Sequence, residues 1–247
     1  MGKPSEIYFM ATCLADLFYP KVGIAGMRLI QREGIRVVFP QNQTCCGQPA
    51  YNSGYREEAL DVARSLMSCF PKDIPIVVPS GSCAGMIRHQ WPELFHGQPD
   101  AQNALNVSKR TYELTQFLVD QVEIELDDLG PSITVAIHTS CSSRNEMKVA
   151  SHIESLVSQM KNVTVVEQER KAECCGFGGS FAIKQAEISG AMVKDKTDAI
   201  GKTEASKLVS QDCGCLMNIG GALRKQKRTI EVQHIAEFLW DRVYETG

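Results

Sequence analysis

Eight of the chain's cysteines fall into two sets with the same spacing, and this repeat constrains the fold more than any other feature of the sequence. Each set opens with one cysteine, continues about 31 residues later with Cys-Cys-Gly, and closes with one cysteine after 36 to 39 more residues. At their four positions the sets are offset by 128, 129, 129 and 132 residues. They consist of Cys13, Cys45, Cys46 and Cys83, and of Cys141, Cys174, Cys175 and Cys215. The chain is therefore predicted to contain two similar halves.

Short apolar runs precede the cysteines in both halves, as expected for buried strands. They lie at 7–11, 36–39 and 76–78 in the first half, and at 133–137, 163–166 and 207–209 in the second. Stretches with apolar residues at three- and four-residue spacing lie between them and indicate helices. Strands that alternate with helices are typical of parallel sheets with crossover helices. The sequence thus predicts an α/β fold of two pseudo-symmetric Rossmann-like domains with mainly parallel sheets.

The boundary between the two domains is marked by charged residues and helix breakers at 127–131, just before a predicted strand. We therefore expect a first cysteine-rich domain at 1–128 and a second at 129–247. Both halves also close on similar segments, at 113–118 and 234–239. The repeat accordingly accounts for most of the chain.

Composition narrows the classes of function. The 26 basic and 29 acidic residues give a net charge of −3, which favours neither nucleic acid nor an anionic membrane as a partner. The apolar runs are too short to cross a bilayer, and the N-terminus lacks the apolar stretch of a secretory signal. We therefore expect a cytoplasmic protein with no transmembrane segment. In that reducing compartment, ten clustered cysteines favour metal binding or redox chemistry over structural disulfides.

The predicted fold can bring the cysteines of one half together, because ligands of open α/β sheets bind where the carboxyl ends of the strands meet. Four thiolates suit an iron–sulfur cluster or zinc, since both accept four cysteine ligands. The adjacent pairs argue mildly against tetrahedral zinc, whose cysteines are usually two to four residues apart. The glycine after each pair lets the backbone turn sharply and approach a metal. The residues thus favour iron–sulfur clusters and leave zinc open.

Two cysteines stand outside the repeat. Cys69 has no counterpart in the other half and is predicted to be an inert, buried packing residue. Cys213 lies two residues before Cys215 and could add a ligand, but the first half has Gly81 in the matching place. We therefore favour Cys215 as the ligand and Cys213 as its neighbour.

His138 is the candidate catalytic residue. It stands at the predicted end of a strand, three residues before Cys141. An imidazole in that place could bind a metal, hydrogen-bond a cluster sulfur or transfer a proton during substrate oxidation. The alternative is a buried histidine whose hydrogen bonds are satisfied within the core.

These residues resemble the cysteine-rich (CCG) domain family of the heterodisulfide reductases and their relatives, and within it the lactate-utilisation branch. The resemblance covers nearly the whole chain and is densest at 174–189, 212–226 and 233–239. It implies up to one iron–sulfur cluster per domain, of the 4Fe-4S type, held by the repeated cysteines. Those ligands would be Cys13, Cys45, Cys46, Cys83, Cys141, Cys174, Cys175 and Cys215.

The resemblance also implies a function. Members of the lactate-utilisation branch transfer electrons in the oxidation of L-lactate to pyruvate. They act with a ferredoxin-like iron–sulfur subunit and a further lactate-utilisation subunit. We therefore expect an oxidoreductase subunit that is not active alone.

The chain departs from the reductase relatives at a fifth ligand position. In those proteins the last cysteine opens a C-x-x-C that supplies a fifth ligand to a double cluster, but here the matching places hold Met86 and Asn218. Many relatives also carry an aspartate and a histidine where this chain has Thr139 and Ser142. Four thiolates per half favour an ordinary cluster, or zinc at one site. The alternatives are a thiol–disulfide reductase subunit and a zinc-stapled scaffold without redox activity.

Overall fold

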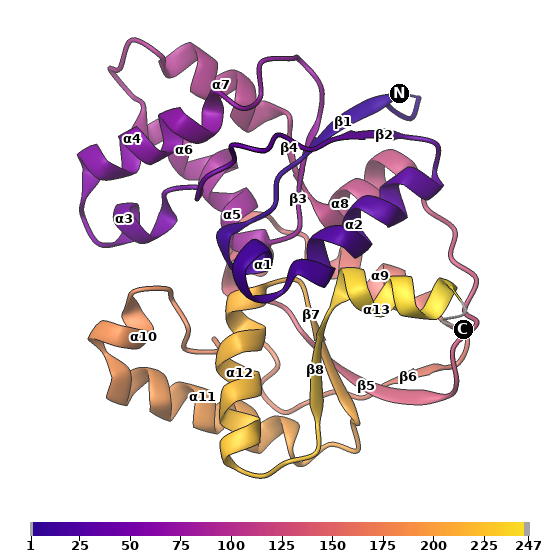
Figure 1. Cartoon of the computed structure of the whole chain (residues 1–247). Coiled ribbons are helices and arrows are strands. Elements are labelled where there is room, and N and C mark those ends of the chain that lie inside the picture. The colour runs from indigo at the N-terminus through magenta and orange to yellow at the C-terminus, as the bar shows by residue number, and fades with distance from the viewer. Residues whose placement is uncertain (1, 245–247) are drawn as a thin grey trace. The chain divides into compact units, whose positions relative to one another are not determined.

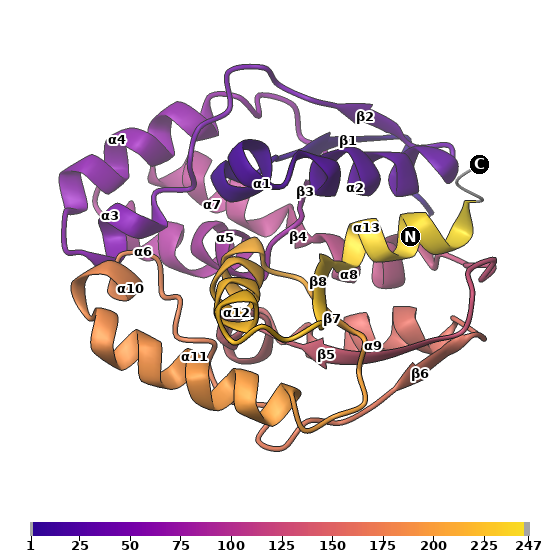
Figure 2. The ribbon, with the colours of Figure 1, turned by 60° about the horizontal axis from the view of Figure 1, so that its bottom comes forward.

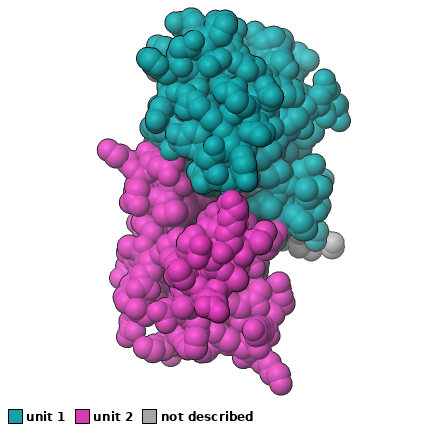
Figure 3. Space-filling model, turned by 90° about the vertical axis from the view of Figure 1, so that its left-hand side faces the viewer, with its two compact units in different colours: residues 1–124 teal, residues 125–247 magenta. Residues whose placement is uncertain are grey.

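A computed structural model describes residues 2–244 of the chain, which divides into two compact units. Unit 1 comprises residues 1–124 and unit 2 residues 125–247 (Figure 3). The sequence places the boundary slightly later, between residues 128 and 129. Residues 123–132 hold neither a helix nor a strand, so both positions fall within the same connecting segment.

Unit 1 alternates four short strands with helical segments (Figure 1). Its strands are β1 (Glu6–Phe9), β2 (Arg36–Val38), β3 (Ile76–Val78) and β4 (Thr111–Glu113). Its α-helices are α1 (Cys13–Phe18), α2 (Pro20–Arg32), α3 (Gln48–Asn52), α4 (Arg56–Met67), α5 (Gly81–Gly85), α6 (Trp91–Leu94), α7 (Ala101–Lys109) and α8 (Leu114–Gln116). Two π-helical segments follow α5 and α8, namely η1 (Met86–Gln90) and η2 (Phe117–Val122).

Unit 2 repeats this alternation with fewer helices. Its strands are β5 (Ile133–His138), β6 (Val163–Val165), β7 (Lys207–Ser210) and β8 (Glu231–His234). Its α-helices are α9 (Ala150–Ser158), α10 (Phe181–Lys184), α11 (Ala186–Ile200), α12 (Cys213–Lys225) and α13 (Ile235–Val243), and a π-helical segment η3 (Ser142–Glu146) follows β5.

The strands of each unit form a four-stranded parallel sheet, and the two sheets have the same topology. The strand order is β2-β1-β3-β4 in unit 1 and β6-β5-β7-β8 in unit 2. The helices between consecutive strands return the chain to the start of the next parallel strand, as such a sheet requires. The predicted α/β fold of two similar Rossmann-like domains with parallel sheets is confirmed.

The fourth strand of each sheet is the element that sequence periodicity did not indicate. β4 and β8 are short and partly polar, with the sequences TYE and EVQH. Each ends in a residue that caps the next helix: a Glu113 carboxylate oxygen accepts from the Thr115 amide at 2.8 Å, and His234 Nδ1 accepts from the Ala236 amide at 3.1 Å. The similar closing segments of the two halves therefore share one structure, a strand that turns into a helix.

The core of unit 2 extends to the cysteines. Helices α11 and α12 pack against each other (Figure 2), and Cys175 and Cys215 belong to the same buried apolar cluster as Val193, Leu208 and Ile219. Two of the sulfur atoms thus lie against a nonpolar wall that excludes water. None of the helices in residues 2–244 combines the length and the apolar character that crossing a bilayer requires.

Candidate metal centres

In unit 1 every repeated cysteine follows the carboxyl end of a strand. Cys13 begins α1, just after β1, and Cys45 and Cys46 lie in the loop between β2 and α3. Cys83 is the third residue of α5, which follows β3. The three neighbouring parallel strands end at the same edge of the sheet, so the three segments that carry the cysteines converge there.

Unit 2 places its own set in the corresponding positions. Cys141 follows β5, and Cys174 and Cys175 lie in the loop between β6 and α10. Cys215 is the third residue of α12, which follows β7, as Cys83 is the third residue of α5. The repeat in the sequence is therefore a repeat in space.

Thiol contacts join the four cysteines of each set in chain order. In unit 1 the Sγ atoms of Cys13 and Cys45 are 3.8 Å apart. In unit 2 the Sγ atoms of Cys175 and Cys215 are 3.0 Å apart. All ten cysteines are free thiols. Each set is therefore a group of sulfur atoms close enough to act together on one ligand.

The first cysteine of each adjacent pair is the thiol of its set that loses its proton most readily. Hydrogen bonds from neighbouring thiols, the largest from Cys13, lower the pKa of Cys45 to about 3. The same arrangement, led by Cys141, lowers the pKa of Cys174 to about 2. The donors keep their protons: the pKa of Cys13 and that of Cys141 are raised by the hydrogen bond each donates and by burial. Ionising all four thiols of a set requires a compensating cation, which a metal supplies as protons leave.

A glycine with left-handed backbone follows each pair. Gly47 has φ +89°, and a Cβ there would lie 3.1 Å from the Ala59 carbonyl oxygen. Gly176 has φ +79°, and its Cβ would lie 2.8 Å from the Ser189 carbonyl oxygen. Only glycine fits both the turn and the close approach to a helix further along the chain, which is α4 at Gly47 and α11 at Gly176. The predicted role of these glycines in turning the backbone thus has a structural basis, although what they approach here is protein backbone.

Glutamine side chains fix both cysteine loops to the central strands. Gln43 Nε2 donates to the Phe9 carbonyl oxygen at 3.1 Å, and Gln168 Nε2 donates to the Ile137 carbonyl oxygen at 3.0 Å. Phe9 and Ile137 are 128 residues apart, the same offset as the opening cysteines. These contacts were not foreseen from the sequence, because a glutamine in a loop carries no motif.

A side chain from beyond the last cysteine holds the carbonyl of the second cysteine in each pair. Trp91 Nε1 donates to the Cys46 carbonyl oxygen at 3.1 Å. Asn218 Nδ2 donates to the Cys175 carbonyl oxygen at 2.8 Å. Asn218 occupies the place where the reductase relatives have a fifth cysteine, so here that position supports the backbone of the pair.

Two cations surround the loop that carries the second pair. Lys196, which is fully buried on α11, donates to the Arg170 and Lys171 carbonyl oxygens at 3.2 and 3.1 Å. Burial lowers its pKa. Arg144 donates to carbonyl oxygens of Thr139 and Ala172 and so connects the segment that carries Cys141 with the loop that carries Cys174. Sequence reasoning missed Lys196, because a lysine on a helix ordinarily faces water.

His138 is the last residue of β5 and is completely buried. Burial, with smaller contributions from Lys196 and Arg144, lowers its pKa to about 3, so the imidazole is neutral near pH 7. One ring nitrogen of His138, the Sγ atom of Cys175 and the Sγ atom of Cys215 lie within 4.8 Å of one another. Three protein donors of this kind can bind one metal ion.

The two cysteines outside the repeat differ from each other. Cys69 follows α4 and is half-buried, with its thiol donating to the Asn42 carbonyl oxygen at 3.5 Å, so the prediction of a buried packing residue is only partly right. Cys213 is buried at the first position of α12, where unit 1 has Gly81 at the first position of α5.

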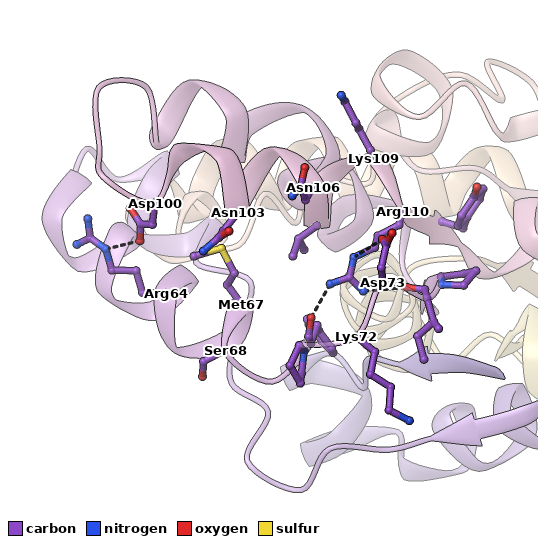
Figure 4. Close-up of a pocket in the computed structure, with 16 residues that line it drawn as sticks. Arg64, Met67, Ser68, Lys72, Asp73, Asp100, Asn103, Asn106, Lys109 and Arg110 are labelled. Carbon is purple, nitrogen blue, oxygen red and sulfur yellow. Dashed lines mark hydrogen bonds and ion pairs between the residues drawn. The ribbon is translucent and has the colours of Figure 1, made fainter.

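A cavity of about 1040 Å³ in unit 1 lies away from the cysteines (Figure 4). It opens at the amino ends of β3 and β4, and its lining contains no cysteine. Arg110 reaches across it to the carbonyl oxygens of Ile74 and Phe70, at 2.8 and 2.5 Å, and Arg64 pairs with Asp100 at 3.0 Å. Arg110 and Arg64 are thus already paired with protein acceptors, and the candidate chemistry stays at the opposite edge of the sheet.

The comparisons with known proteins match this duplicated arrangement. The family model of the CCG cysteine-rich domain matches twice, at residues 7–88 and 135–220. Lactate utilization protein A of Geobacillus kaustophilus is 43% identical, and the match covers 95% of this chain and 98% of that protein. The proteins of the same name from Oceanobacillus iheyensis and Shouchella clausii are 41% and 42% identical, over 95% of this chain and 96% and 98% of theirs.

A solved structure shares the fold at low identity. It is the crystal structure of a hypothetical protein from Helicobacter pylori, with a TM-score of 0.69 and 8% identity. The match covers 99% of this chain and 50% of that one, so the chain spans half the length of that structure. This likeness shows the fold alone.

Proposed function

The chain belongs to the CCG cysteine-rich domain family of lactate utilization protein A, and on that premise we propose that it is an iron–sulfur electron-transfer subunit of an L-lactate oxidation complex. Each unit would hold one cluster, of the 4Fe-4S type, on its four repeated cysteines. The observation that carries the proposal is the pair of four-thiol groups, each at the carboxyl edge of its own parallel sheet.

The donor sets fit such a group. Thiolates are the ligands of iron–sulfur clusters, and four of them complete a 4Fe-4S site. The second cysteine of each pair and the last cysteine are buried, whereas Cys13 is half-buried and Cys141 is exposed. Each site is thus shielded on one side and accessible on the other. When bound, the clusters would accept and release single electrons, and the accessible side would face the electron partner.

A relay accounts for this chain better than a self-contained oxidation. Conversion of L-lactate to pyruvate releases two electrons and two protons, and a cluster takes up one electron at a time. Binding of lactate needs a cation for its carboxylate, but Arg144, close in sequence to Cys141, already donates to two backbone carbonyl groups. We therefore assign substrate binding to a partner, with a ferredoxin-like iron–sulfur subunit and a further lactate-utilisation subunit completing the complex.

The test measures whether electrons from lactate reach the iron held by this chain. The chain is reconstituted anaerobically with ⁵⁷Fe, combined with unlabelled partner subunits, and exposed to L-lactate while Mössbauer spectra are recorded. Lactate should reduce the labelled iron only when the partners are present. A double variant, Cys46→Ser with Cys175→Ser, serves as the control that cannot assemble either site.

Two other results would replace the proposal. Turnover of a disulfide by this chain without partners would identify a thiol–disulfide reductase subunit. A chain that holds only zinc, yet still supports lactate oxidation by its partners, would identify a zinc-stapled scaffold.

A further inference from the structure

The imidazole of His138 is in an unfavourable environment for a core residue. The side chain is completely buried, and among residues 2–244 neither Nδ1 nor Nε2 has a hydrogen-bond partner. Leaving one buried polar group unpaired typically costs about 1–3 kcal/mol. A histidine retained for packing would satisfy at least one nitrogen, as His234 does through the Gln211 carbonyl oxygen and the Ala236 amide. The interpretation of His138 as a satisfied core residue is therefore wrong.

What lies near His138 is sulfur. One of its ring nitrogens lies within 4.8 Å of the Sγ atoms of Cys175 and Cys215, which lie equally close to each other, and all three side chains are buried. A neutral imidazole offers a lone pair, which is the form in which histidine binds metals. One unpaired nitrogen thus lies within 4.8 Å of two of the four sulfur atoms proposed to hold a cluster.

Unit 1 provides an internal comparison at the same place. Met10 precedes Cys13 by three residues, as His138 precedes Cys141, and both positions follow a carbonyl held by a glutamine. Met10 is equally buried. Its thioether is a weak donor and fills the core there. The two positions therefore correspond in the two units, and their side chains differ.

We propose that His138 is a metal ligand at the second site, where it takes the place of one of the four thiolates that the proposed function assigns there, which makes that site a mixed cysteine–histidine centre beside an all-cysteine centre in unit 1. This inference rests on the proposed function for the identity of the metal group. A nitrogen ligand among thiolates changes the reduction potential of a cluster, because ligand identity is one of the terms that set it. The two clusters of one chain would then be reduced in separate steps.

The test is pulsed electron paramagnetic resonance on protein made with ¹⁵N-labelled histidine and reduced anaerobically with dithionite. Direct ligation predicts a strong coupling to one ¹⁵N nucleus in the unmodified chain. The coupling should disappear in His138→Gln and persist in Met10→Leu, the matched control from unit 1. A redox titration of the same proteins should show one reduction step displaced in His138→Gln and neither displaced in Met10→Leu.

The outcomes separate this inference from the proposed function. Intact clusters with no strong ¹⁵N coupling, or with a coupling that survives His138→Gln, would overturn the ligand assignment and leave the relay standing. A chain that holds zinc instead of iron would contradict the relay, yet the ligand assignment could still be measured after exchange with ¹¹³Cd. In that case a one-bond ¹⁵N–¹¹³Cd coupling to His138 supports ligation, and its absence overturns it.

Discussion

Met10 in unit 1 and His138 in unit 2 occupy corresponding positions, yet one is a thioether packed in the core and the other an imidazole with unpaired nitrogens. The loops that carry the cysteine pairs also differ, in the charge of the side chains that hold them. In unit 1, Gln43 ties its loop to the strand with a neutral amide. In unit 2, Gln168 does the same, and the buried ammonium group of Lys196 adds a positive charge beside the loop.

The comparison separates what the repeated fold determines from what individual side chains determine. Sheet topology, the glycine after each pair and the position of the last cysteine on its helix are the same in both units, so the fold fixes where four sulfur atoms gather. The side chains that line each group then set its charge and its additional donors. Duplication thus gives two sites of the same framework and unequal chemistry.

The largest effect is expected from removing one set of ligands at a time. Cys45→Ser with Cys46→Ser should lose the metal of unit 1, and Cys174→Ser with Cys175→Ser that of unit 2. Each double variant should retain about four of about eight irons per chain, because each thiol group is built within its own unit. Iron analysis after anaerobic reconstitution measures this. Loss of all iron from either variant would mean that the two sets form one shared site.

The next largest effect is expected from breaking a buried ion pair that stabilises unit 2. Arg242 and Asp128 are 2.6 Å apart and nearly inaccessible to water. Asp128→Ala leaves a buried guanidinium unpaired and should lower the free energy of unfolding by about 3–5 kcal/mol. Hydrogen exchange should show the loss in unit 2. Equal loss of protection in unit 1 would contradict separate stabilisation.

This ion pair also predicts a pH dependence. Burial alone would raise the pKa of Asp128, but hydrogen bonds from Arg242, Asn162 and Gly130 hold it below its ordinary value of 3.8. The unfolded chain therefore binds this proton at higher pH than the folded one. The stabilisation is complete well above pH 4 and is lost as the pH falls through the lowered pKa. Urea titrations between pH 7 and 3 should show this decline in the unmodified chain and a smaller one in Asp128→Ala.

A smaller loss of stability is expected from replacing the glycine that follows each cysteine pair. Gly176→Ala and Gly47→Ala both force a Cβ into a left-handed turn against a backbone oxygen, and the approach is closer at Gly176. Each should lower the free energy of unfolding by about 1–3 kcal/mol, with the larger loss at Gly176. Gly190→Ala is the control, because its Cβ would meet no atom within 4 Å. Equal stability of all three variants in urea titrations would show that the turns do not constrain the pairs.

The smallest effect concerns a side chain that holds a pair carbonyl. Asn218→Ala removes the donor to the Cys175 carbonyl oxygen and should cost about 1 kcal/mol. Thermal unfolding measures this cost. If Asn218→Ala instead abolished metal binding in unit 2, Asn218 would be a ligand rather than a support for the backbone.

The cysteine spacing and the apolar runs predicted the fold class and the strands β1, β2, β3, β5, β6 and β7. The expectation that all of these runs are buried was wrong for β2 and β6, because each is the edge strand of its sheet and is exposed or only partly buried. The spacing and the runs did not reveal β4 and β8, which are short and polar. They indicated that His138 lies beside Cys141, but not that it faces Cys175 and Cys215. In the sequence His138 lies 37 residues before Cys175 and 77 before Cys215, so their proximity depends on how the loops fold.

The side chains that hold the cysteine loop of unit 2 could not be predicted from the sequence either. Gln168 and Lys196 act through backbone carbonyl groups, and such contacts leave no pattern in the sequence. The burial of Lys196 depends on the path of the loop at 166–175, which local propensity does not determine. The ligand types were thus predictable from residue identity, whereas the charge around them was not.

The central claim is that each unit binds an iron–sulfur cluster through its own cysteines. It is tested most directly by counting iron, zinc and acid-labile sulfide in anaerobically purified chain, with absorption spectra before and after dithionite. We predict about eight irons and about eight sulfides per chain, with broad absorbance near 400 nm that dithionite bleaches. Colourless protein that carries only zinc, even after anaerobic reconstitution with iron and sulfide, would contradict the claim.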